Sequence, residues 1–248
     1  MRISVITVCR NSASTIGRTL ESFFRQEHAD KELVVIDGAS TDETTSIVAS
    51  FASENLTLIS ERDSGLYDAM NKGLRTFRGA AVGFLNSDDR FHDPWALSAV
   101  SAALEAADIV FGDLDVVNDQ DRGGVVRRWR SSPWRKGAFR NGWMPAHPTF
   151  YCRRRVVDRV GPFDLRYKVA ADYDYMLRAM EGCDFAVGRT SGVLVDMAAG
   201  GLSSVGVWGR VHHNLEALDS RRRWLGSGPL DYALFAKPLR KVGQYARI

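Results

Sequence analysis

The chain has 248 residues, of which 45% are hydrophobic and 25% are charged, with a formal net charge of +3 at pH 7. This composition is enough for a full hydrophobic core and predicts one globular α/β unit with a C-terminal tail. The three cysteines are far apart without CxxC spacing and no stretch reaches the ~18 apolar residues of a membrane span, so a disulfide framework, a structural zinc site and a transmembrane protein are all disfavoured. With no leader before the first strand, a cytoplasmic protein is expected.

Strands and helices are predicted to alternate through the first half of the chain. The expected strands are 3–8, 32–37, 56–60 and 82–86, and the expected helices are 14–25, 43–53, 65–77 and one starting near 93–95. This alternation favours a parallel sheet with helices on both faces. Beyond it we expect a hairpin around 118–124, a helix opening at 171 and a helix over about 207–224.

Polar side chains stand where the predicted strands end. Asp37 closes the second strand, Asp63 follows the third, and residues 86–89 (Asn-Ser-Asp-Asp) close the fourth. Ligands of parallel α/β sheets bind beyond these carboxyl ends, so acceptors for a base, a ribose and a metal gather at one edge. Asp88 and Asp89 suit Mg²⁺ or Mn²⁺, which prefer hard oxygen ligands. The alternative is that Ser87 or Asp88 merely caps the following helix.

A dinucleotide-binding dehydrogenase is the nearest competing nucleotide enzyme. Its first turn needs glycines that let the backbone approach a pyrophosphate, whereas residues 9–14 here read Cys-Arg-Asn-Ser-Ala-Ser. The dehydrogenase interpretation is therefore disfavoured.

Basic residues are concentrated in two places. Residues 201–248 carry a net charge of +5, and residues 122–157 hold nine further Lys or Arg from Arg127 onward and no acidic residue, interleaved with Trp129, Trp134 and Trp143. Such mixtures can bind nucleic acid, diphosphates or a membrane surface, or can simply be solvated. The stretch lacks a recognisable nucleic-acid-binding motif, and we expect no nucleic-acid partner.

Six segments, taken together, resemble family 2 inverting glycosyltransferases, in the family's order and spacing over residues 1–205. They are 6–8, 35–42, 65–73, 86–89, 147–150 and 170–174. The likeness is greatest to bacterial exopolysaccharide and colanic-acid-type enzymes. It implies a GT-A fold, with a nucleotide-sugar-binding half (1–112), an acceptor-binding half (113–205) and a basic helical tail (206–248). It also implies a nucleotide-diphosphate sugar donor, Mn²⁺ or Mg²⁺, and a saccharide or polyprenyl-diphosphate-linked acceptor.

The resemblance also assigns roles to single residues. Asp172 would be the general base, and His147 would contact the acceptor. Asp88 and Asp89 would hold the metal and the diphosphate. The nucleotide pocket would be formed by Thr7, Cys9, Asp37, Asp63, Asn71, Lys72 and Asp88.

Departures from the family pattern leave alternatives open. Asn86 replaces the first carboxylate of the DxD element, and Ala171 replaces an acid before the proposed base. Asp172 could instead be a helix N-cap, and His147 could be satisfied by loop carbonyls. No QxxRW motif is present, so a processive synthase is not expected. A catalytically silent nucleotide-sugar-binding or polyanion-binding protein is the alternative function.

The segment 206–248 has an approximate apolar face with a basic end. Two interpretations are open. The segment could lie on an anionic bilayer at the inner face of the cytoplasmic membrane. It could instead pack onto the catalytic domain or a second subunit. The residues concerned are Val207, Trp208, Val211, Leu215, Leu218, Arg221, Arg222, Arg223 and Trp224, followed by the apolar Leu230, Tyr232, Leu234, Phe235, Leu239 and Val242 and the basic Lys237, Arg240, Lys241 and Arg247.

Overall fold

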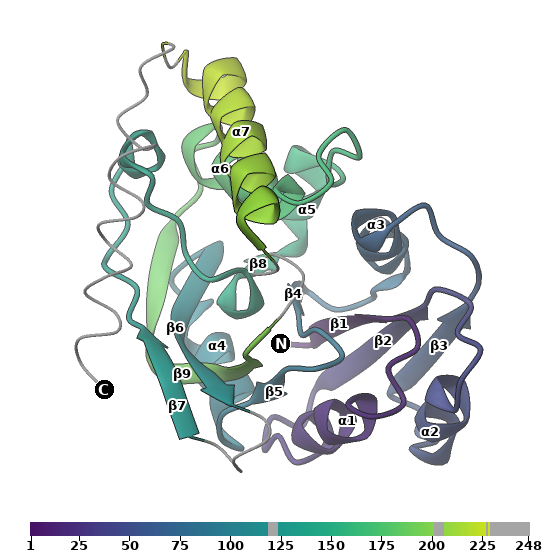
Figure 1. Ribbon diagram of the computed structural model, residues 1–248. Coiled ribbons are helices and arrows are strands. Elements are labelled where there is room, and N and C mark those ends of the chain that lie inside the picture. Colours follow the sequence, from purple (N-terminus) through teal and green to yellow (C-terminus); the bar gives the residue numbers. More distant parts are fainter. Residues whose placement is uncertain (119–123, 201–205, 227, 229–248) are drawn as a thin grey trace.

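The computed structural model describes residues 1–118, 124–200, 206–226 and 228 (Figure 1). In these ranges nine strands form one sheet in the order β3-β2-β1-β4-β8-β6-β9-β5, with β7 paired to β6. The strands are β1 (Ile3–Cys9), β2 (Lys31–Asp37), β3 (Leu56–Ser60), β4 (Ala81–Phe84), β5 (Arg90–Phe91), β6 (Ile109–Asn118), β7 (Gly124–Trp129), β8 (Tyr151–Arg153) and β9 (Val187–Ala198). The helices are α1 (Ile16–Phe24), α2 (Thr44–Ser50), α3 (Leu66–Thr76), α4 (Ala96–Ala103), α5 (Arg154–Val160), α6 (Ala171–Glu181) and α7 (Gly206–Leu225), with short 3₁₀ turns at Ala138–Asn141 and His147–Thr149.

The predicted parallel half-sheet is confirmed. β1 pairs in parallel with both β2 and β4, and β2 pairs in parallel with β3. The continuous apolar sequences of β1 and β2 fit this position, because a strand covered on both faces has no solvent side to reserve for polar residues. Beyond β4 the sheet becomes mixed, since β8 runs antiparallel to both β4 and β6.

Two hydrophobic clusters cover the two faces of the sheet. One joins the sheet to α3, α5 and α6 through residues such as Met70, Val156 and Met176. The other packs α1, α2 and α4 on the opposite face, through residues such as Leu20 and Val100. Helices therefore cover both faces, as the alternation of elements predicts.

The predicted hairpin is present as β6 and β7, which pair antiparallel, although its tip at residues 119–123 lies outside the described residues. Some arginines of the basic stretch around it make contacts within the protein. Arg130 pairs with Asp115, and Arg155 pairs with Asp108. Arg153 and Arg154 donate to backbone carbonyls of neighbouring segments. A partner would therefore meet only part of this charge.

Helix α7 confirms the predicted helix over 207–224 and lies against α6 (Figure 1). Of its residues, Ala217, Leu218, Ser220 and Arg221 are buried. The packing interpretation thus holds for Leu218 and Arg221, whereas Val211, Leu215 and Trp224 are exposed. Residues 229–248 lie outside the described ranges. No helix in the described part of the chain has the length and apolarity of a membrane span.

Candidate active site

The carboxyl ends of β1, β2 and β3 enclose the Asp37 carboxylate. Cys9 lies directly beside Asp37 in the parallel register, and its thiol donates to Asp37 Oδ1 at 3.7 Å. Asp37 Oδ2 accepts from the Ser60 hydroxyl at 2.6 Å and from the Ser40 N–H at 3.0 Å. Burial by itself would raise the pKa of Asp37, but these donors outweigh it and lower that pKa. Asp37 is therefore kept as an anion at the edge of the sheet.

Thr7 and Asp63 complete this corner. The Thr7 side chain is buried, and its Oγ1 has no hydrogen-bond partner. Asp63 approaches the backbone at Gly38 so closely that a Cβ there would lie 2.5 Å from Asp63 Oδ2. Glycine at position 38 thus allows Asp37 and Asp63 to share one corner, as their predicted placement requires.

Asn71 and Lys72 both make internal contacts. The Asn71 amide donates to the Phe163 carbonyl at 3.0 Å and accepts the Phe163 N–H at 2.8 Å. Lys72 Nζ pairs with Glu61 at 3.0 Å and donates to the Arg62 carbonyl at 2.6 Å. Asn71 therefore fixes the loop around Phe163, and Lys72 fixes the loop after β3.

The two aspartates after β4 differ sharply in environment. Asp88 is exposed, whereas Asp89 is only 2% exposed. Asp89 Oδ1 accepts the Ala198 N–H, and Oδ2 accepts the Asn86 amide, both at 3.0 Å. Burial, followed by the nearby charge of Asp88, raises the pKa of Asp89 to about 8. Asp89 thus anchors the end of β9, and Asp88 is the carboxylate presented to solvent.

The capping interpretation of Ser87 and Asp88 is wrong, because α4 begins only at Ala96 and its N-cap is Trp95. Instead, the Ser87 hydroxyl lies 3.0 Å from that of Ser12 in the loop after β1. This contact joins the loop after β4 to the Asp37 corner.

Asp172 occupies the first turn of α6 and is half-buried. Its Oδ1 accepts a hydrogen bond of 3.1 Å from the hydroxyl of Tyr67 on α3. The N-cap of α6 is Ala170, which provides no side-chain cap. The interpretation of Asp172 as an N-cap is therefore wrong, and its carboxylate faces the other half of the protein.

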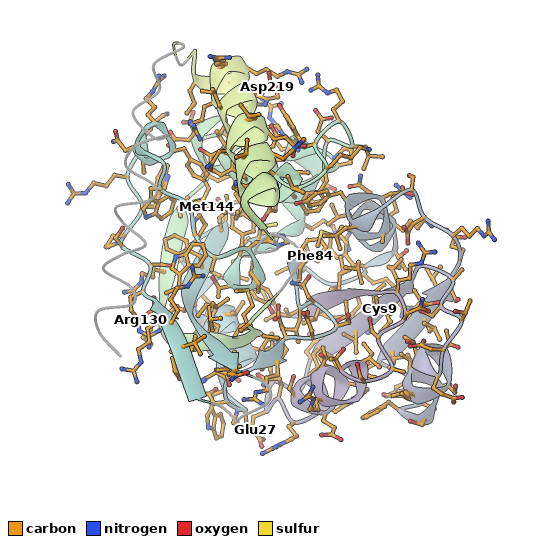
Figure 2. All side chains as sticks on the ribbon, viewed as in Figure 1. Cys9, Glu27, Phe84, Arg130, Met144 and Asp219 are labelled. Atoms are coloured by element: carbon orange, nitrogen blue, oxygen red, sulfur yellow. The ribbon has the colours of Figure 1, made fainter. Side chains whose placement is uncertain are left out.

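His147 lies in an aromatic setting next to Asp172. Its ring stacks on Phe84, the last residue of β4, with centroids 5.3 Å apart, and meets Phe163 edge-on at 6.1 Å (Phe84 is labelled in Figure 2). The ring is 8% exposed, and its Nε2 has no hydrogen-bond partner. Burial lowers the pKa of His147, and the Asp172 charge opposes this only in part. The alternative, in which loop carbonyls accept the hydrogen bonds of the His147 ring, leaves Nε2 without a partner.

The geometry thus places a carboxylate corner, an exposed aspartate and a tyrosine-bound aspartate at loops and helix starts around the sheet. A comparison with known families finds that the model of "Glycosyl transferase family 2" matches residues 4–160. The chain belongs to glycosyl transferase family 2. A relative from Mycobacterium tuberculosis (strain ATCC 25177 / H37Ra), named PGL/p-HBAD biosynthesis glycosyltransferase, is 34% identical over 186 residues, covering 71% of this chain and 68% of the relative.

Solved structures confirm that this family 2 glycosyltransferase has the GT-A fold. Staphylococcus aureus TarS 1-349 in complex with UDP-GlcNAc superposes with a TM-score of 0.68 at 20% identity, over 99% of this chain and 78% of that one. Mannosyltransferase PcManGT from Pyrobaculum calidifontis, in complex with GDP-Man and Mn²⁺, gives a TM-score of 0.68 at 23% identity, over 95% of this chain and 68% of that one.

A divalent cation bound to this glycosyltransferase would take its protein ligands from the side chains after β4. Within the described residues no group of three or more His, Cys, Asp or Glu side chains is arranged to hold a metal. Asp88 alone offers an exposed carboxylate there, because both Asp89 oxygens already accept protein hydrogen bonds. One carboxylate fits a cation that takes its other ligands from phosphate and water, as Mg²⁺ commonly does.

Two further residues of this site received no individual role from the sequence. Tyr67 lies inside the 65–73 motif, and only the fold shows that its hydroxyl reaches Asp172. Glu216 lies on α7, and its carboxylate contacts the backbone that leads into α6. Each contact joins residues far apart in sequence, so the regular residue spacing of a helix or strand could not have predicted it.

Proposed function

We propose that this family 2 enzyme is an inverting glycosyltransferase that moves a sugar from a nucleotide-diphosphate donor to a hydroxyl of a saccharide or polyprenyl-diphosphate-linked acceptor. The observation that carries the proposal is Asp172, a half-buried carboxylate at the start of α6 whose Oδ1 is fixed by Tyr67. The neighbours in complex with UDP-GlcNAc and GDP-Man support the donor class.

The Asp37 corner would receive the nucleoside. Asp37 is held as an anion by Ser40, Ser60 and Cys9, and it would accept from a base or ribose in place of one of these donors. Thr7 Oγ1 offers a buried hydroxyl without a protein partner at the same pair of strands. Asp63 would line this pocket beside Gly38, while Asn71 and Lys72 would shape it from behind through the loops that they fix.

Asp88 would face the diphosphate and hold Mn²⁺ or Mg²⁺. The neighbour in complex with Mn²⁺ supports a cation at this step. A bound cation supplies electrostatic stabilisation of the charge that develops on the departing diphosphate. Asp89 would keep the loop after β4 in place through its bonds to Ala198 and Asn86.

Asp172 would remove the proton from the acceptor hydroxyl as that oxygen attacks the anomeric carbon opposite the leaving group. The C–O bond to the acceptor forms while the bond to the diphosphate breaks, so the anomeric configuration inverts. Because Tyr67 occupies Oδ1, Oδ2 is the oxygen that would take the proton. His147, buried beside Asp172, would contact the acceptor through Nε2 once the acceptor is bound.

A donor screen tests the proposal. Uridine, guanosine and thymidine diphosphates and their sugars are added to the protein with millimolar Mn²⁺ or with EDTA, and the melting temperature and diphosphate release are measured. A ligand that binds only the native state must raise the melting temperature. We expect one nucleotide to raise it in the presence of Mn²⁺ and its sugar to be hydrolysed slowly. The proposal fails if no nucleotide shifts the melting temperature, and the silent binding protein gains support if binding occurs without hydrolysis or transfer.

A further inference from the structure

A carboxylate of α7 holds the backbone that leads into α6. Glu216 Oε1 accepts the N–H of Lys168, and Glu216 Oε2 accepts the N–H groups of Val169 and Ala170, each at 2.9 Å. Ala170 is the N-cap of α6, and Asp172 is the second residue of that helix. Three successive donors therefore converge on one side chain immediately before the proposed general base.

This arrangement anchors a helix start that has no side-chain cap. Alanine is a poor N-cap because it has no side-chain acceptor for the first N–H groups of a helix, and Ala170 provides none. A negative charge at a helix start is also favoured by the helix dipole. Glu216 supplies this charge from a different helix, 46 residues away from Ala170 in sequence, and accepts the N–H of the N-cap residue and of the two residues before it.

Helix α7 is itself anchored, so Glu216 has a defined position. One turn further along, the Ser220 hydroxyl donates to Asp174 Oδ1 at 2.8 Å, and Trp224 Nε1 donates to the same oxygen at 3.1 Å. Arg221 is buried and donates to the Tyr173 hydroxyl at 3.0 Å. Asp219, labelled in Figure 2, accepts from the Tyr167 hydroxyl at 2.8 Å.

We propose that Glu216 is a positioning residue that fixes Asp172 through the backbone, while Tyr67 fixes the carboxylate itself. This inference rests on the proposed role of Asp172 as general base. A displacement of about 1 Å in a reacting group can lower turnover by up to about 10²-fold. Release of residues 168–170 from Glu216 therefore reduces catalysis without touching the nucleotide corner at Asp37.

The test compares Glu216→Gln with Ser220→Ala in the full-length protein. Glu216→Gln keeps the size of the side chain but removes its charge and places an amide N–H where an acceptor is needed. Ser220→Ala removes one of the anchors of the same helix, while Arg221 and Trp224 still hold α7 against α6 and the bonds of Glu216 to residues 168–170 are kept. Arg222→Gln, on the exposed side of α7, controls for the loss of a charge. Hydrogen exchange of residues 165–175, the melting temperature, and hydrolysis of the donor selected by the screen are measured on each variant.

We expect Glu216→Gln to speed exchange at 168–170 and to lower kcat by about 10-fold or more, with the donor KM unchanged. Ser220→Ala should lower the melting temperature and keep kcat, and Arg222→Gln should resemble the wild type. Unchanged exchange at 168–170 in Glu216→Gln overturns the proposed contact, whatever the activity. Faster exchange with normal kcat reduces Glu216 to a structural residue and also overturns the proposal.

Asp172→Asn in the same assay separates the two hypotheses. If Asp172→Asn keeps normal kcat, the proposed general base fails, and the positioning role fails with it. If Asp172→Asn is defective while Glu216→Gln is normal, only the role of Glu216 fails.

Discussion

The hydroxyl of Tyr67 on α3 donates a hydrogen bond of 3.1 Å to Asp172 Oδ1 on α6, across 105 residues of sequence. Tyr67 is buried, and burial followed by the Asp172 charge raises its pKa well above the ordinary value, so the phenol keeps its proton and remains a donor. The contact links the half of the protein that carries the Asp37 corner, the proposed nucleotide site, to the helix that carries the proposed base.

The first prediction concerns this pair. Asp172→Asn should keep donor affinity and lower turnover by about 10²-fold or more, as expected for loss of a general base. Tyr67→Phe should lower turnover by only about 10-fold, because the carboxylate remains but loses one orienting bond of roughly 1.5–3 kcal/mol. Steady-state kinetics on the two single variants and the double variant measure this.

The double variant should be no worse than Asp172→Asn, since Tyr67 acts through Asp172. Effects that multiply across the two sites would show that Tyr67 serves another function. Near-normal turnover of Asp172→Asn would remove Asp172 from the mechanism.

The second prediction separates the two aspartates after β4. Asp88→Asn should change the free energy of unfolding in urea less than Asp89→Ala does, because Asp88 is exposed, and should remove the Mn²⁺-dependent part of nucleotide-diphosphate binding in calorimetry. Asp89→Ala should cost about 1–3 kcal/mol of unfolding free energy, because it removes a buried side chain and leaves the half-buried Ala198 N–H and Asn86 amide without their acceptor. Mn²⁺-dependent binding that survives Asp88→Asn would contradict the assignment of the metal to Asp88.

Much of the fold could be predicted from sequence, because local patterns determine it. The hydrophobic runs of β1 and β2 and the apolar spacing of α1 define elements that the structure confirms within one or two residues at most ends. The sequence likewise predicted that the polar residues at the ends of β2 and β4 lie at one edge, since the carboxyl ends of parallel strands meet there. The mixed pairing of β8 with β4 and β6 was not predicted, because a three-residue strand has almost no periodic signal.

The motifs of the candidate site could be recognised in the sequence, but the burial and the hydrogen bonds of their residues could not. Adjacent aspartates 88 and 89 read alike in sequence, yet one is exposed and the other is enclosed by β9, which arrives more than 100 residues later. Asn71 reads as a polar pocket residue, whereas both ends of its amide are used by Phe163. Such differences depend on long-range packing, which residue spacing does not encode.

The third prediction concerns the pH dependence of stability. Burial lowers the pKa of His147 in the folded state, whereas an unfolded histidine titrates near 6.5. Below about pH 6.5 the unfolded chain therefore binds a proton that the folded protein refuses, so stability falls as the pH drops from 6.5 toward the lowered pKa. His147→Phe should remove this component while keeping the stacking on Phe84. Urea unfolding at pH 7.5, 6.5 and 5.5 measures it, and parallel pH profiles of the two proteins would refute the prediction.

The fourth prediction concerns the outward side of α7, where a membrane contact remains a hypothesis. Val211 and Leu215 are 39% and 58% exposed, one helical turn apart, and Arg222 is exposed further along. Deletion of residues 206–248 would also remove Glu216 and the buried Arg221, so point substitutions are the better test. Val211→Ser with Leu215→Ser leaves those contacts in place.

If the helix lies on an anionic bilayer, sedimentation with anionic vesicles should exceed that with neutral vesicles, weaken with salt, and fall in the double variant. Trp95→Ser, at the start of α4 on the opposite face of the sheet, removes an apolar side chain that is 61% exposed; it is the matched control and should sediment like the wild type. Equal binding by the wild type and the Val211/Leu215 variant would exclude this face of α7 as the membrane contact.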